Sequence, residues 1–203
     1  MRVQLMTWFL FGLVRLLTGT HGRWYGCPPK AVQRIYFANH QSHADLVLIL
    51  GALPGSLRSV TRPIAAKDYW TASPFKQWLT TAVFNAVYVD RVRTGDADPL
   101  EPLITALDAG DSIILFPEGT RGFDEWPQPF KAGLYNLGQR FPQVELIPVW
   151  ISNVQRVMPK GEVVPIPVLC SVTFGAPCPV LENESRADYL VRAREAVIAL
   201  KSV

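Results

Sequence analysis

Short apolar runs alternate along the chain with segments whose apolar residues recur at helical spacing. Runs of aliphatic, β-branched and aromatic residues predict strands at 34–38, 86–89, 112–116, 145–150 and 169–174. Helical spacing predicts helices at 43–51, 74–81, 98–109, 131–141 and 186–201. This alternation is typical of a single α/β domain in which helices flank a mostly parallel or mixed central sheet.

The N-terminal segment 3–17 is apolar on most sides of a helix and is interrupted by Arg15. A helix of this length spans about 22 Å, whereas a bilayer core is about 30 Å thick. We therefore expect residues 1–22 to form a short membrane-associated helix at the interface, with Arg15 among anionic headgroups. Residues 23–203 would then form the α/β domain itself. A buried core helix and a signal peptide are the alternatives for this segment.

The composition of the chain suits one folded domain with an anionic partner. It has 203 residues, of which 49% are hydrophobic, and this excludes a disordered chain. Residues 1–93 carry a net charge of +8 and residues 94–203 a net charge of −5. The basic half indicates phospholipid headgroups or a phosphate-bearing substrate, or else a merely uneven surface. Zinc-finger spacing and Lys/Arg runs are absent from the sequence, which disfavours nucleic acid as the partner.

The three widely spaced cysteines fit neither a disulfide framework nor a metal site, and they favour the cytoplasmic side of a membrane.

A polar string, NHQSHAD at 39–45, directly follows the first predicted strand. On one continuous helix His40 and Asp45 would point about 140° apart. A turn with Ser42 as helix N-cap, in a capping-box pattern with Asp45, lets the carboxylate reach back to the imidazole. Such a pair would fix the tautomer of the ring and stabilise its protonated form. The alternative is that Asp45 only caps the helix.

Two further polar strings also follow predicted strands. Arg91 comes after the strand at 86–89, and its planar guanidinium suits a phosphate. The string FPEGTRG at 116–122 comes after the strand at 112–116, which Pro117 ends. Ligands of open α/β sheets bind beyond the carboxyl ends of strands, so parallel strands would bring all three strings to one edge. Taken alone, each string is also compatible with an ordinary surface turn.

Taken together and in this order, the strings closely resemble the lysophosphatidate (1-acylglycerol-3-phosphate) acyltransferase family. The patterns of that family are Asn-His-x-Ser-x-x-Asp, an apolar or aromatic pair before Arg, Phe-Pro-Glu-Gly-Thr-Arg-Ser, and an apolar segment ending in Pro, here LIPV at 146–149. The resemblance covers about residues 35–150. Gly122 stands where the family pattern has Ser, and the chain before His40 is short.

The resemblance implies an activity and a role for each matching position. It implies transfer of a fatty acyl group from acyl-CoA or acyl carrier protein to lysophosphatidate at the cytoplasmic face of the cell membrane, without metal or cofactor. Another lysophospholipid or a lyso-aminolipid would offer the same hydroxyl chemistry. His40 would be the general base, and Asp45 would orient it. The implied substrate contacts are Lys67, Arg91, Glu118, Gly119, Thr120 and Arg121, with Pro148 in the acyl-chain region.

A competing interpretation is a serine lipase or esterase, because GDS at 110–112 matches the nucleophile string of one lipase class. That class needs a histidine late in the chain, whereas all three histidines here precede residue 44. The sequence also lacks a Gly-x-Ser-x-Gly elbow. A third interpretation, a catalytically silent lipid-binding protein, predicts no thiol release from an acyl donor.

Overall fold

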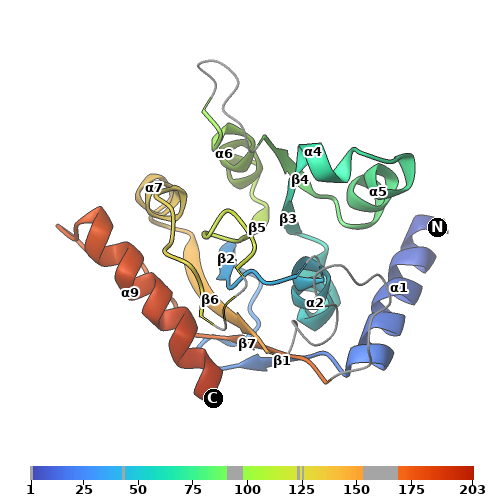
Figure 1. Cartoon of the computed structure of the whole chain (residues 1–203), viewed down its shortest axis with the longest axis horizontal. Coiled ribbons are helices and arrows are strands. Elements are labelled where there is room, and N and C mark those ends of the chain that lie inside the picture. Colours follow the sequence, from blue (N-terminus) through green and yellow to red (C-terminus); the bar gives the residue numbers. More distant parts are fainter. Residues whose placement is uncertain (1, 43, 91–97, 123, 125, 153–168) are drawn as a thin grey trace.

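The computed structural model describes residues 2–42, 44–90, 98–122, 124, 126–152 and 169–203. Its strands form one mixed sheet in the order β1-β7-β6-β2-β5-β3-β4 (Figure 1). The β6–β7 pair is antiparallel, and the other described pairs are parallel, which confirms the predicted sheet. The strands are β1 (His21–Trp24), β2 (Arg34–Ala38), β3 (Thr61–Ala66), β4 (Val87–Val89), β5 (Ser112–Leu115), β6 (Glu145–Ile151) and β7 (Ser171–Phe174).

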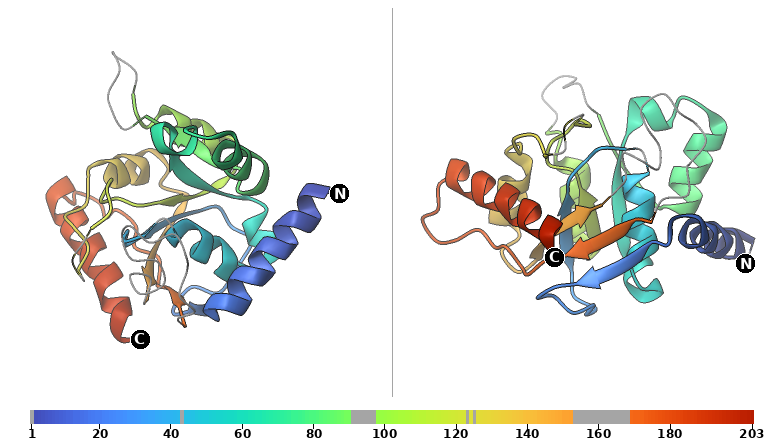
Figure 2. Two further views of the ribbon diagram at one scale, coloured as in Figure 1. Left: turned by 45° about the vertical axis from the view of Figure 1, so that its right-hand side comes forward. Right: turned by 60° about the horizontal axis from the view of Figure 1, so that its bottom comes forward.

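Helices cover both faces of this sheet (Figures 1 and 2). The helices α1 and α2 lie on one side of it, and α7 and α9 lie on the other. The bounds are α1 (Arg2–Thr18), α2 (Asp45–Ala52), α3 (Gly55–Arg58), α4 (Lys67–Trp70), α5 (Pro74–Trp78), α6 (Glu101–Asp108), α7 (Gly133–Arg140) and α9 (Arg186–Ala199), with a π-helical turn η1 (Leu79–Val83) and a 3-10 turn η2 (Leu200–Ser202).

The central strand β2 explains the layered core. Its side chains are buried on both faces, as expected for a strand between two helical layers. Tyr36 and Ala38 pack with the side of α1 and α2, whereas Ile35 and Phe37 pack with the side of α6, α7 and α9. Successive side chains of a strand point to opposite faces, so one short run supports both halves of the core.

Two strands and two short helices were not predicted. The strand β1 has the polar sequence HGRW and pairs with β7 at the edge of the sheet. The strand β3 contains Pro63, which argues against a strand when the sequence is considered alone. The helices α3 and α4 are single turns of four residues, too short for periodicity to reveal. The predicted helix at 74–81 begins as α5 and continues as the π-helical turn η1.

The predicted N-terminal helix is α1, and it lies against the domain rather than apart from it. Phe11 is 2% exposed and packs in the core beside α2. Arg15 is exposed and its Nε donates to the carbonyl of Gly51 at 2.8 Å, so its expected contact with anionic headgroups stays a prediction. Within the described part of the chain, no helix is long and apolar enough to cross a bilayer.

Candidate active site

Two of the predicted polar strings meet at the carboxyl ends of neighbouring parallel strands. Phe37 in β2 pairs with Leu115 in β5, so the segments that follow them leave the same edge of the sheet. The backbone N–H of Gly122 donates to the carbonyl of His40 at 2.9 Å and joins the two segments directly. Arg91, which the sequence placed beside them, lies outside the described residues.

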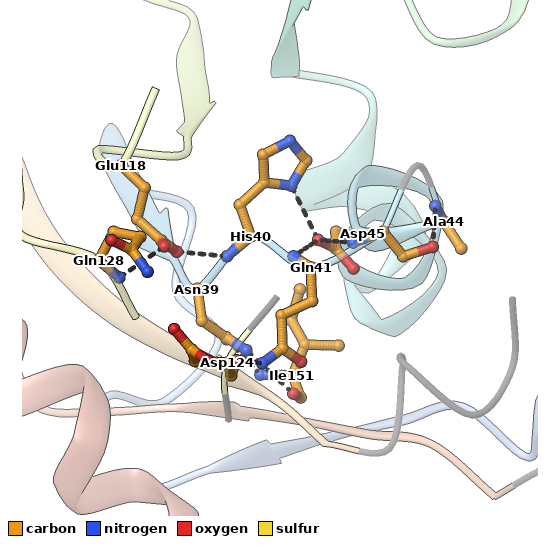
Figure 3. A network of polar contacts seen from close by, with 10 residues as sticks. Asn39, His40, Gln41, Ala44, Asp45, Glu118, Asp124, Gln128 and Ile151 are labelled. Carbon is orange, nitrogen blue, oxygen red and sulfur yellow. Dashed lines mark hydrogen bonds and ion pairs between the residues drawn. The ribbon is translucent and has the colours of Figure 1, made fainter. Parts of the chain in front are cut away.

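His40 and Asp45 form the predicted imidazole–carboxylate pair (Figure 3). His40 Nδ1 lies 2.8 Å from Asp45 Oδ2, and the Asp45 side chain is 0% exposed. The same oxygen accepts backbone N–H groups of Gln41 at 2.7 Å and Ser42 at 2.9 Å. These donors hold the carboxylate in place, so the neutral ring carries its proton on Nδ1 and presents the lone pair of Nε2.

The local geometry differs from the expected capping box. The helix α2 begins at Asp45, its N-cap position is Ala44, and no side chain caps it there. Ser42 Oγ instead accepts the N–H of Ala44 at 3.2 Å within the turn. The predicted N-cap role of Ser42 is therefore wrong. The tight turn before α2 still brings the carboxylate back to the ring, because Asp45 binds the N–H groups that precede it.

Glu118 supports the loop that carries the histidine. Its Oε1 accepts the backbone N–H of His40 at 2.7 Å, and its Oε2 accepts that of Gln128 at 2.7 Å (Figure 3). The side chain is only 2% exposed. Burial raises the pKa of this carboxyl, and the two N–H donors oppose the rise. Both oxygens are thus occupied within the protein, which favours positioning of His40 over contact with a substrate.

Two contacts that the sequence did not predict complete the support of His40. Its ring stacks on Phe116 with centroids 4.2 Å apart and planes inclined by 18°. Asn39 binds the end of β6 through two hydrogen bonds, accepting the N–H of Ile151 at 2.8 Å and donating to its carbonyl at 3.2 Å. Asn39 was visible in the NHQSHAD string, but nothing local identified its partner 112 residues away.

The remaining predicted site residues differ in burial and in whether they lie next to a cavity. Gly119 adopts φ +68° in the turn after β5, a left-handed conformation that favours glycine. Thr120 is exposed and Arg121 is half-buried beside it. Lys67 begins α4 directly after Ala66, which lines the cavity described next. Pro148 is buried in β6 opposite Phe37 and lines neither cavity described below.

A cavity of about 170 Å³ opens beside the catalytic pair. His40, Phe116 and Gly119 form its wall on the motif side. The rest of the lining is apolar and comes from α2, β3, α4, β4 and β5, through Leu46, Ile64, Ala66, Trp70, Val89 and Leu115. The histidine therefore faces a space suited to a hydrocarbon chain.

Ser112, the nucleophile of the competing hydrolase interpretation, lies at the other end of its strand. It begins β5, is 3% exposed, and its Oγ accepts the N–H of Arg34 at 3.0 Å. This buried hydroxyl has no access to the cavity beside His40. Among the described residues, no group of three or more His, Cys, Asp or Glu side chains is placed to hold a metal ion.

A family model described as Acyltransferase matches residues 28–152, which include every predicted site residue. The chain belongs to the acyltransferase family. The chain is 33% identical over 158 residues to 1-acyl-sn-glycerol-3-phosphate acyltransferase alpha of Homo sapiens, a match covering 76% of this chain and 51% of that protein. It is 28% identical over 138 residues to a 1-acyl-sn-glycerol-3-phosphate acyltransferase of Chlamydomonas reinhardtii, covering 66% and 39% of the two chains.

A solved structure extends the similarity to almost the whole chain. The crystal structure of the 1-acyl-sn-glycerophosphate (LPA) acyltransferase PlsC from Thermotoga maritima superposes with a TM-score of 0.72 at 25% identity. The match covers 99% of this chain and 82% of that one. By contrast, the chain spans about half the length of the mammalian relatives that it matches.

Proposed function

We propose that this acyltransferase moves a fatty acyl group from a thioester to the free hydroxyl of lysophosphatidate and so forms phosphatidate. The observation that carries the proposal is the 2.8 Å contact between His40 Nδ1 and the buried Asp45 carboxylate, beside an apolar cavity. Its relatives named 1-acyl-sn-glycerol-3-phosphate acyltransferase support the choice of acceptor. The donor is acyl-CoA or acyl-loaded acyl carrier protein, either of which supplies an activated thioester.

The mechanism follows from the free nitrogen of the ring. His40 Nε2 takes the proton of the acceptor hydroxyl as its oxygen attacks the thioester carbonyl carbon. The C–O bond forms, the tetrahedral intermediate collapses, and the C–S bond breaks. The imidazolium then returns the proton to the leaving thiolate, so that free thiol and phosphatidate are the products. Asp45 stabilises the imidazolium, and a positioned base of this kind contributes about 10²–10⁴-fold to the rate.

The substrate groups are assigned by the chemistry of the surrounding residues. The apolar cavity beside His40 receives the acyl chain next to the reacting carbonyl. Arg121 and Lys67 are the described cations of the predicted site, and their side chains suit the phosphate of the acceptor. Glu118 acts by holding the His40 loop, through the two backbone hydrogen bonds to its carboxylate. This reaction needs no cofactor besides the thioester.

We also propose that α1 rests on the membrane that supplies the lipid acceptor. Its inner face packs through Phe11, whereas Trp8 and Leu16 are each 82% exposed on the outer face. The helix α5 adds the exposed aromatic side chains of Phe75 and Trp78. A helix with its apolar face outward is suited to lipid rather than to water. The three cysteines are free and buried, which is compatible with the reducing, cytoplasmic face of a membrane.

The test of membrane association uses surface substitutions that leave the core intact. Trp8→Glu combined with Leu16→Glu should move the protein from vesicle pellets of anionic phospholipid to the supernatant. Val191→Glu is the matched control, because Val191 is also exposed but lies on α9, on the other side of the sheet. Unchanged sedimentation of the double variant, or equal loss in the control, would contradict the proposal.

The test of the activity is thiol release by the pure protein with acyl-CoA and lysophosphatidate, together with mass spectrometry of the lipid product. His40→Ala should lower kcat at least about 10²-fold while the circular dichroism spectrum is retained. His21→Ala is the control, because this exposed histidine of β1 lies outside the site. Wild-type turnover in folded His40→Ala, or release of free fatty acid instead of phosphatidate, would overturn the assignment.

A further inference from the structure

A second, larger cavity adjoins the one beside His40. It measures about 480 Å³, within the range of about 300–1,000 Å³ that is typical of small-molecule sites. The two cavities share Leu115, Phe116 and Gly119 in their linings. A ligand that fills the second cavity therefore reaches the turn after β5, next to the catalytic ring.

Lys131 lines the larger cavity and lies against Gly119, which also lines the smaller one. Its backbone N–H donates to the carbonyl of Pro117 at 2.8 Å, which ties the entrance of α7 to the turn after β5. A Cβ placed on Gly119 would lie 2.5 Å from Lys131 Nζ and 2.9 Å from its Cε. The lysine thus extends back over Gly119, and the missing side chain of that glycine creates the space for it.

The charge of Lys131 is available to a ligand. Within the described part of the chain, its ammonium group makes no hydrogen bond or ion pair with another side chain. Asn136 of α7 adds an amide to the same cavity. Asp98 also lines it, but its Oδ1 accepts the N–H of Leu100 at 2.9 Å in the turn before α6. A cavity with an unpaired cation next to the reacting centre suits an anionic group.

We propose that Lys131 binds a phosphate group of one of the two substrates in the 480 Å³ cavity and thereby positions that substrate against His40. The inference rests on the proposed acyl transfer and adds a residue to its site that the sequence did not single out. Both substrates offer the same chemistry, because lysophosphatidate carries a phosphate monoester and acyl-CoA carries phosphate and pyrophosphate groups. Lys131 acts as a point charge, so that an arginine in its place retains part of the binding.

The experiment compares Lys131→Met and Lys131→Arg with the wild type in steady-state thiol release, varying each substrate at a saturating level of the other. Lys131→Met should raise the KM of one substrate about 10- to 100-fold and leave kcat within about twofold. Lys131→Arg should recover most of that loss. Lys30→Met is the matched control, because Lys30 is exposed and lines neither cavity.

Two arms identify which phosphate is bound. If the acceptor phosphate is bound, the KM of lysophosphatidate rises, and turnover of monoacylglycerol, which lacks a phosphate, is equal in wild type and Lys131→Met. If the donor phosphates are bound, the KM of acyl-CoA rises, and turnover of an acyl-pantetheine thioester is equal in the two proteins. Either pattern supports the proposal.

Equilibrium dialysis of radiolabelled lysophosphatidate and of CoA separates failure of this inference from failure of the proposed function. A wild type that neither turns over nor binds these molecules would refute the acyl-transfer proposal itself. An active wild type with unchanged KM values and unchanged binding in Lys131→Met would overturn only the role of Lys131. A fall in kcat alone, or the same change in Lys30→Met, would also overturn it.

Discussion

Replacing Asp45 by Asn tests whether this carboxylate acts through His40. The wild-type Oδ2 accepts three hydrogen bonds, from His40 Nδ1, the N–H of Gln41 and the N–H of Ser42. An Asn side chain of almost the same shape keeps all three if its oxygen takes that place. The charge that stabilises the imidazolium is lost. We therefore expect kcat to fall about 10²–10⁴-fold, with the KM of both substrates within about twofold.

The loss of stability in Asp45→Asn can be estimated from Oδ1, the second carboxylate oxygen of Asp45. Oδ1 is buried and has no hydrogen-bond partner among the described residues. In Asp45→Asn the amide nitrogen occupies this place, and a buried donor without a partner costs about 1–3 kcal/mol. A domain typically has an unfolding free energy of about 5–15 kcal/mol. The variant should thus remain folded at 25 °C, with a lower midpoint in urea unfolding.

The assay combines thiol release with a double-mutant cycle. If Asp45 acts only through the ring, His40→Ala/Asp45→Asn has the same kcat as His40→Ala alone. Asp108→Asn serves as the control substitution, because Asp108 is exposed at the end of α6. A wild-type kcat in Asp45→Asn would refute this reasoning. An additional tenfold loss on top of His40→Ala would refute it as well.

Two other predictions concern the loop after β5. Because burial raises the pKa of Glu118 in the folded protein, its contribution to stability is present at low pH and is lost as pH rises through the folded-state pKa. We therefore expect wild type to lose stability relative to Glu118→Gln between about pH 4 and about pH 8. The measurement is the difference between their unfolding free energies in urea titrations at each pH. A difference that grows with pH would contradict this sign. Arg121→Ala should raise the KM of lysophosphatidate about tenfold with little change in kcat, whereas a fall in kcat alone would indicate that Arg121 acts on the transition state.

The local signals of the chain were sufficient for most of the fold. The apolar runs that became β2, β5, β6 and β7 are buried between helices, so their composition alone marks them. The edge strand β1 and the proline-containing β3 carry no such signal in their composition. Pairing with β7 holds β1 in place, and pairing with β5 holds β3 in place. The apolar side of α1 was predicted, but the hydrogen bond from Arg15 to the carbonyl of Gly51 depends on the packing of α1 against the domain.

In the candidate site, too, some contacts were predictable from the sequence and others were not. The approach of His40 to Asp45 was predictable from their spacing, because five residues and one tight turn decide it. The contacts that support this pair could not be predicted from the sequence. Glu118 accepts a hydrogen bond from the backbone of His40, 78 residues away, and Asn39 donates one to Ile151, 112 residues away. Lys131 lies over the turn after β5, where its backbone N–H binds the carbonyl of Pro117. Sequence thus determined which groups can do the chemistry. Tertiary structure decided how they are held, because contacts between distant segments exist only after the sheet has formed.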